Sequence, residues 1–140
     1  SYNHQMVEKT RPNLNFTILC DDVRQEMGGK ISLMGIFDNL YAQSFPAVHP
    51  RLVIINEWSE GAGDFDTTLR ILAPDRKSVL RENNARLKMA NQGQKHRDVS
   101  IHMNIEFREP GTYWIESYLD GMLVSSLPLN VVQVKAKSFG

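Results

Sequence analysis

The segment Gly28-Gly29-Lys30-Ile31-Ser32 resembles a nucleotide-binding loop in its glycines and lysine. A phosphate-binding loop needs Ser or Thr directly after the lysine, to reach Mg²⁺, and a glycine five residues before the second one. Here Ile31 follows the lysine, and Arg24 stands at the earlier glycine position. The residues that follow alternate as in a β-strand, so no helix N-terminus points at a phosphate. We therefore interpret this segment as a hairpin turn and expect no nucleotide cofactor.

Three histidines, His49, His96 and His102, are candidates for metal ligands. Their spacings do not match the close pairs that commonly bind metals, and a single cysteine supplies no zinc pattern. The aspartates in Asp21-Asp22 and Asp64-Phe65-Asp66 could offer oxygens to Ca²⁺, but aspartates also shape turns. We expect surface histidines and no bound metal.

The sequence contains no recognisable catalytic constellation. Cys20 is in phase with the apolar residues of a predicted strand, which indicates a buried, inert thiol. No serine stands in a G-x-S-x-G elbow. The pairs Glu57/Glu60 and Glu106/Glu109 could be imagined as acid and base, but nothing in the sequence indicates a raised pKa for either pair. We expect no catalytic residue, no cofactor and no enzymatic activity.

The charge balance bears on the class of partner. Lys+Arg and Asp+Glu both number 16, so the formal net charge is zero. A dedicated nucleic-acid binder needs surplus positive charge to displace counterions, so we expect no nucleic-acid partner. Basic residues do concentrate between residues 70 and 97, but acidic residues dilute this patch, and a solvated face explains it. Zero net charge also does little to keep copies of the chain apart.

The length of 140 residues fits one domain that can bury a core. No apolar run has the form of a signal peptide or the length of a membrane span, so we expect no membrane partner. One cysteine permits no intrachain disulfide, which indicates a cytoplasmic protein. We predict an N-terminal tail over residues 1–13, a β-domain over 14–134 and a C-terminal tail over 135–140.

The fold class follows from residues 99–127, where apolar and polar side chains alternate strictly. Side chains two apart on a strand share a face, so the alternation predicts a strand with one dry and one wet side. The predicted dry side comprises Val99, Ile101, Met103, Ile105 and Phe107. Pro110-Gly111 and Asp120-Gly121 then mark two chain reversals. We predict an antiparallel all-β domain, an immunoglobulin-like β-sandwich of about eight strands.

The remaining predicted elements have similar signals of alternation and turn residues. Leu52–Ile55 is apolar on both faces, which is typical of a central strand, and Gly35 marks a bulge or a close approach. The other predicted strands cover residues 14–20, 31–37, 65–71 and 78–89, with 131–134 extending the last hairpin. Residues 81–87 could also be helical, and 21–27 could be an edge or a turn. Residues 38–50 and 91–98 are predicted connections.

The segment Glu109-Pro110-Gly111-Thr112-Tyr113 resembles the tyrosine corner of immunoglobulin-like domains. In such a corner the tyrosine begins a strand, and its hydroxyl returns to nearby backbone. The cysteine that follows in antibody domains is replaced here by Ile115. The resemblance therefore implies the sandwich architecture rather than an antibody.

Three further motifs resemble an uncharacterised family of small bacterial proteins over roughly residues 14–134. They are F-T-I-L-C-D-D-V-R at Phe16–Arg24, G-K-I-S-L-M-G-I-F at Gly29–Phe37, and P-G-T-Y near the end. The family has no established activity, so the resemblance implies no functional residues.

The candidate interface residues are Trp114, Glu116 and Tyr118. If Tyr113 and Ile115 point inward, alternation sends these three side chains outward, and two exposed aromatics can form part of an interface. Another strand, the tail or the 38–50 connection could instead cover them. We expect a protein that acts through a protein partner or through its own copies, with a homodimer as the assembly. The alternative is a module that binds a sugar or lipid through the end loops near residues 61–66 and 91–98.

Overall fold

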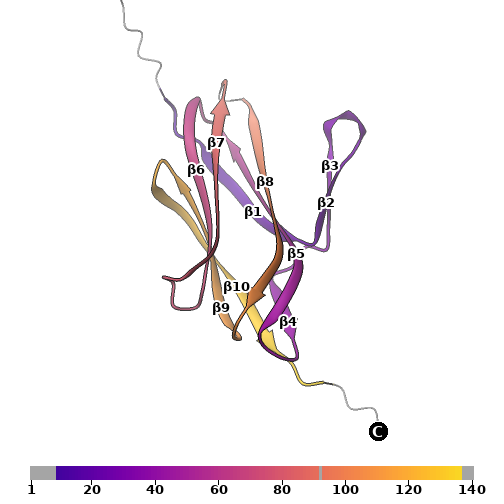
Figure 1. The fold of residues 1–140 in the computed structure, drawn as a ribbon. Helices are drawn as coiled ribbons and strands as arrows, with labels where there is room; N and C mark the ends of the chain where they lie inside the picture. The colour runs from indigo at the N-terminus through magenta and orange to yellow at the C-terminus, as the bar shows by residue number, and fades with distance from the viewer. Residues whose placement is uncertain (1–8, 92, 137–140) are drawn as a thin grey trace, which may run out of the picture.

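The computed structural model describes residues 9–91 and 93–136. Within them the chain forms strands and one short 3-10 turn, so the fold is all-β (Figure 1). The strands are β1 (Asn13–Cys20), β2 (Asp22–Gln25), β3 (Ile31–Met34), β4 (Asn39–Ala42), β5 (Ala47–Ser59), β6 (Gly63–Leu72), β7 (Val79–Met89), β8 (Lys95–Phe107), β9 (Gly111–Leu119) and β10 (Met122–Gln133). The predicted tails fall largely on residues 1–8 and 137–140, which lie outside the described residues.

The strands form three sheets. The orders are β1-β5-β8, β4-β10-β9-β6-β7 and β2-β3. The structure corrects two details of the prediction, since the described residues hold ten strands rather than about eight, and β4 pairs with β10 in parallel. The strand β4 lies inside the segment 38–50, which was predicted to be a connection.

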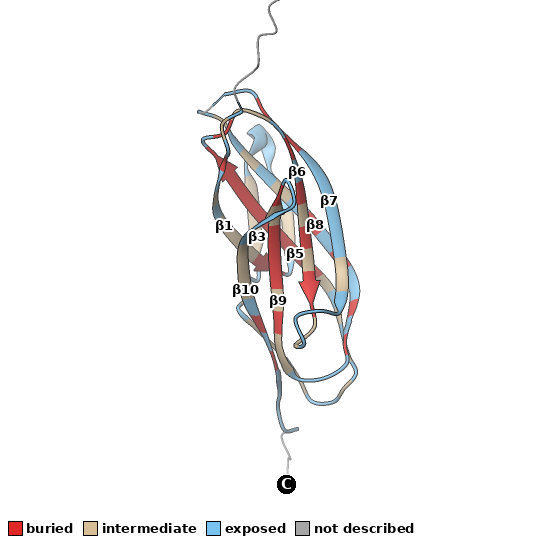
Figure 2. Cartoon of the chain, turned by 90° about the vertical axis from the view of Figure 1, so that its left-hand side faces the viewer, coloured by how far each residue is buried: buried red, intermediate tan, exposed pale blue. Residues whose placement is uncertain are grey.

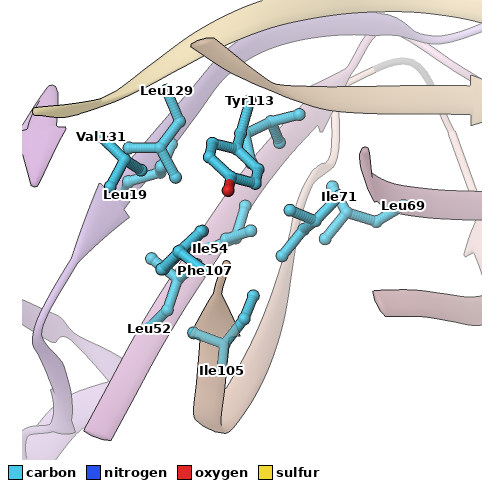
Figure 3. Close-up of a cluster of buried hydrophobic side chains, with 11 residues drawn as sticks. Leu19, Leu52, Ile54, Leu69, Ile71, Ile105, Phe107, Tyr113, Leu129 and Val131 are labelled. Atoms are coloured by element: carbon cyan, nitrogen blue, oxygen red, sulfur yellow. The ribbon is translucent and has the colours of Figure 1, made fainter. Parts of the chain in front are cut away.

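The main core lies between the three-stranded and five-stranded sheets (Figure 3). Its buried side chains come from both sheets: Leu19, Leu52, Ile54, Leu69, Ile71, Ile105, Phe107, Tyr113, Ile115, Leu129 and Val131. A second cluster surrounds Trp58 at the other end of β5. The two sheets therefore stabilise each other by burying their facing apolar side chains.

Strand β5 is the centre of the three-stranded sheet, as its apolar character predicted. Leu52 and Ile54 point into the main core, while Val53 and Ile55 form a third cluster with Cys20 on the opposite face. All five side chains are buried. The strand is longer than predicted, and β8 likewise begins at Lys95, inside the predicted loop 91–98.

The structure corrects the predicted dry side of β8. Ile105 and Phe107 are buried, but Val99, Ile101 and Met103 are 42%, 47% and 53% exposed. The sequence alternates throughout, yet the apolar side chains up to Met103 and those from Ile105 onward lie on opposite faces of the sheet. In the first half of β8 the buried positions are therefore taken by the polar Ser100 and His102, and the apolar side chains are exposed.

The reversal occurs at Asn104, which has a φ of +50°. Asparagine tolerates this left-handed conformation, and a single such residue changes the face to which the following side chains point. Asn104 lies opposite Pro50, between the pairs His49–Ile105 and Arg51–Met103. Pro50 has no N–H to donate to the hydrogen-bond ladder at this position.

The turn between β9 and β10 has the predicted conformation. Asp120 and Gly121 have φ values of +47° and +79°, as a two-residue hairpin turn requires. No atom lies within 4 Å of a Cβ built on Gly121, so a side chain there would cause backbone strain without a clash.

We expect Gly121→Val to lower the free energy of unfolding by about 1 kcal/mol, because a β-branched residue resists positive φ. Gly93→Val is the control, since Gly93 does not have a left-handed φ. Urea denaturation of both variants measures the difference. Equal stability of Gly121→Val and the wild type would contradict the assigned turn.

Candidate functional site

The predicted interface residues lie on the outer face of β9, which is flanked by β6 and β10. Trp114 and Tyr118 are half-buried, and Glu116 is only 7% exposed. Tyr113 and Ile115 point into the core, so the predicted alternation holds along this strand. The three residues therefore share one face at the middle of the five-stranded sheet, where Figure 2 shows β9 as mostly buried.

Each aromatic ring on this face is covered by an arginine of the same chain. The Arg76 guanidinium lies 3.8 Å from the centroid of the Trp114 ring, and the Arg70 guanidinium lies 5.0 Å from that of Tyr118. Cation–π attraction contributes most where the cation is partly desolvated. The arginine side chains thus occupy the space above the two rings, which the sequence did not predict.

The turn between β6 and β7 holds Arg76 in this position. The Asp75 carboxylate accepts hydrogen bonds from the Ser78 hydroxyl and from the backbone N–H groups of Lys77 and Ser78. These bonds, with that of the Ser78 hydroxyl first, lower the pKa of Asp75 to about 2. Arg76 itself has a φ of +60° and also donates to the Ser126 hydroxyl.

The Glu116 carboxylate lies between the two covered rings. It accepts a 2.8 Å hydrogen bond from the Tyr118 hydroxyl, and the Arg76 Nη2 lies 4.0 Å away. This hydrogen bond raises the pKa of Tyr118. An acceptor carboxylate with a tyrosine and an arginine beside it holds these side chains in fixed positions.

A second surface, the β8 apolar strip, consists of Val99, Ile101 and Met103. These side chains lie on the outer face of the three-stranded sheet, where Ile101 pairs with Val53 and Val99 with Ile55. The apolar surface therefore runs from the buried side chains of β5 to the exposed ones of β8. Sequence reasoning missed this surface, because nothing in the alternation marks the reversal at Asn104.

The β2–β3 arm, residues 21–35, forms a separate two-stranded sheet that projects from the two larger sheets (Figure 1). Val23 and Leu33 pack on the cluster of Cys20, Val53 and Ile55. The tip of the arm is the turn predicted at Gly28-Gly29, and Met27 there is 96% exposed. The arm thus covers the β5 part of the outer face and leaves the β8 part open.

The described residues also form a pocket of about 670 Å³ at the end of the molecule where the β6–β7 and β8–β9 turns meet. Its lining includes Arg81, Arg108, Glu106 and Tyr113. The end loops predicted for ligand binding, near residues 61–66 and 91–98, belong to the β5–β6 and β7–β8 turns at the opposite end. The pocket is therefore not built from the predicted loops.

The other chemistry-bearing residues are dispersed. Burial raises the pKa of the Cys20 thiol, which donates to the Asp22 carbonyl. Among the described residues, no three His, Cys, Asp or Glu side chains are placed to hold a metal ion. In the basic segment 70–97, Arg70, Arg86 and Arg97 form ion pairs with Glu82, Asp66 and Glu57.

His102 is a buried histidine of β8. Burial, and secondarily the charge of Arg81, lower its pKa, and its Nε2 lies 3.2 Å from the Ser100 hydroxyl. The unfolded chain therefore binds a proton at this site at a higher pH than the folded chain does.

We expect stability to fall as the pH drops below about 6.5, the ordinary histidine pKa, because the unfolded state takes up this proton first. In His102→Gln this contribution is absent, so the loss of unfolding free energy between neutral and mildly acidic pH becomes smaller. Urea denaturation of both proteins across that range measures the difference. Identical pH dependence in the two proteins would contradict the buried neutral state of His102.

Together these features define a small all-β protein with one arginine-covered aromatic face and one open apolar strip. Among the described residues, no helix has the length and apolar character needed to span a membrane. The chain belongs to the family of unknown function DUF6941, whose model matches residues 15–132. None of the curated proteins compared with the chain matches it. The match confirms the predicted membership of an uncharacterised family.

Proposed function

We propose that this protein is non-enzymatic and acts through protein–protein contact, with another protein or with copies of itself. The β8 apolar strip is the observation that carries the proposal. Large exposed apolar patches with a polar rim mark interaction sites on soluble proteins. The strip continues the buried cluster of β5, so a partner seated there would extend an existing apolar core.

The rim of the strip supports the same proposal. At one end Arg97 pairs with Glu57 at 3.1 Å, and at the other Arg51 pairs with Asp22 at 3.2 Å. An apolar centre between paired charges matches the usual anatomy of a protein interface. Paired charges also fit a protein partner better than a nucleic acid, which needs free cations to displace counterions.

The face of Trp114, Glu116 and Tyr118 remains a second proposed interface. Tryptophan, tyrosine and arginine are the residues enriched at interface hot spots, and all three types meet here. A partner at this face would contact the Arg70 and Arg76 side chains together with the rings beneath them. Such a partner would contact charged side chains, whereas a partner at the β8 apolar strip would contact apolar ones.

The same proposal includes an immunoglobulin-like sandwich and a cytoplasmic setting. The two facing sheets and the Tyr113 hydroxyl, which donates to the Glu109 carbonyl at 2.7 Å, support the first. The unpaired, buried Cys20 supports a reducing compartment. A small-ligand module is the alternative, and the end pocket of about 670 Å³ favours it.

The test uses the full chain as bait in an extract of its native host, with two single variants. Ile101→Lys places a charge in the β8 apolar strip, and Val79→Lys places one on an equally exposed apolar residue of the end pocket. We expect Ile101→Lys to weaken capture of specific host proteins about tenfold, a change of about 1.4 kcal/mol, and Val79→Lys to leave it unchanged.

Either of two results would count against the proposal. Equal capture by all three baits would show that the β8 apolar strip is not the interface. Loss of capture only in Val79→Lys would instead place the protein interface at the end pocket.

A further inference from the structure

We propose that the free edge of β1 binds an extended peptide segment of another protein, which adds to the three-stranded sheet as a further strand. This inference goes beyond the proposed function, because it concerns a surface other than the β8 apolar strip and a different kind of partner. It is carried by the unpaired backbone of β1, by two apolar hollows beside this strand and by the charges around them.

β1 is an edge strand, and one side of its backbone faces no other strand. Among the described strands its sheet neighbour is β5, and the pairing is regular from Phe16 to Cys20, after a bulge between Leu14 and Phe16. On the other side, the Phe37 N–H donates to the Leu19 carbonyl at 3.0 Å. The N–H and C=O groups of one strand residue point to the same side, and alternate residues share that side. Thr17 therefore presents both of its backbone groups to the open side.

Two hollows follow this open side, between β1 and β10 of the facing sheet. The first, of about 280 Å³, is lined by residues 14–17 together with Val124, Ser125 and Leu127. The second, of about 330 Å³, is lined by residues 17–19, by residues 36–39 and by part of β10 from Leu127 onward. Thr17 and Leu127 border both hollows, so the two adjoin. Most of the lining residues are apolar, so alternate side chains of an added strand would bury apolar surface there.

Apart from the bulge at its start, β1 lacks the features that keep sheet edges from pairing. Natural edges are protected by charged side chains, by proline or by being short. The other edge strands of the two large sheets are β4, which has four residues, and β7 and β8, which carry several charged side chains. β1 has eight residues, N-L-N-F-T-I-L-C, with neither a charge nor a proline. Such an edge is a template for another strand, so its occupant is extended backbone.

The charges around the hollows indicate which segment fits. Asp38 lines the second hollow and has no ion-pair partner among the described residues, whereas the first hollow has no charged lining residue. In strand addition, backbone hydrogen bonds provide affinity and pockets for alternate side chains provide specificity. The fitting segment therefore alternates apolar residues and carries Lys or Arg near Asp38. The β1 strand of a second copy would bring no cation to this position.

Binding of synthetic peptides to the full chain tests the inference. The probes are seven-residue peptides, capped at both ends, in which Val, Ile or Leu alternates with Thr or Lys. Calorimetry measures their affinity. We expect binding to slow hydrogen exchange at the Thr17 amide, which faces the open side, and to leave that of Ile18, which faces β5, unchanged.

N-methylated peptides separate strand pairing from general apolar contact, because methylation removes N–H donors and keeps the side chains. Methylation of one alternate set of residues should weaken binding at least about tenfold. Methylation of the other set, whose N–H groups would face solvent, should have little effect.

Two valines of β10 supply a matched pair of variants. Val124→Lys places a charge in the first hollow and should weaken peptide binding about tenfold. Val132→Lys is the control, because Val132 does not line either hollow and the two valines are 37% and 38% exposed. Circular dichroism confirms that both variants are folded.

Three results would overturn the inference. The first is that no peptide of the panel binds at millimolar concentration. The second is equal binding by both N-methylated sets, which would mean that the peptide does not pair as a strand. The third is a concentration-dependent dimer that Val124→Lys abolishes, which would make a second copy the occupant. Ile101→Lys should leave peptide binding unchanged, so a failure at β1 leaves the β8 apolar strip to the bait experiment.

Discussion

Replacement of Trp58 by alanine is expected to lower the free energy of unfolding by about 3–5 kcal/mol, the usual range for a large buried aromatic. Trp58 is completely buried on β5 and packs with Phe65, Leu87, Met89 and Leu119. These neighbours come from the opposite sheet, so truncation would leave a cavity between the sheets. Strand ladders on both sides limit how far that cavity can collapse.

The second tryptophan provides a matched control. Trp114 is half-buried on the outer face and is covered by one side chain, Arg76. Its replacement by alanine removes a smaller apolar area and the cation–π contact, so we expect a loss well below that of Trp58→Ala. Urea denaturation followed by circular dichroism compares the two. Equal losses would contradict the burial assigned to Trp58.

Tyr113→Ala is expected to have a similarly large effect, about 3–5 kcal/mol, for two separable reasons. The ring of Tyr113 is buried in the main core and meets Phe107 edge-to-face, with 4.8 Å between the ring centroids (Figure 3). Its hydroxyl donates to the Glu109 carbonyl at 2.7 Å. The ring therefore fills the core while the hydroxyl fastens the β8–β9 turn.

Tyr113→Phe separates these two contributions. It keeps the ring and removes the hydroxyl, so the Glu109 carbonyl loses its donor at a cost of about 1–2 kcal/mol. Tyr41→Phe is the control, because Tyr41 is exposed. We expect this variant to change the free energy of unfolding by less than about 0.5 kcal/mol. If Tyr113→Phe leaves the free energy of unfolding unchanged, the hydroxyl does not stabilise the turn.

Local patterns predicted much of the fold. Along β6 the predicted inward set, Phe65, Thr67, Leu69 and Ile71, is buried. The predicted close approach at Gly35 is also present, with a φ of +70° and Asp21 too near for a Cβ. Alternation and turn chemistry act between neighbours in sequence, so they can be recognised without knowledge of the partner strands.

The sequence was least informative where one strand depends on another. The reversal at Asn104 lies opposite Pro50, which is more than fifty residues away in the chain. β4 is short, and its pairing with β10 becomes visible only once both strands are in place. The β8 apolar strip follows from the first of these pairings, so sequence reasoning could not find it.

By itself, the sequence determined the all-β class, most strand positions, the Asp120-Gly121 turn and the return of the Tyr113 hydroxyl to nearby backbone, because each is signalled by residues a few positions apart. Only the tertiary structure decided which apolar side chains are buried and which are exposed. It placed Arg70 and Arg76 over the aromatic rings of β9, packed the β2–β3 arm on β5, and exposed Ile101. Burial and stacking depend on residues distant in the chain, and the folded sheets alone bring those residues together.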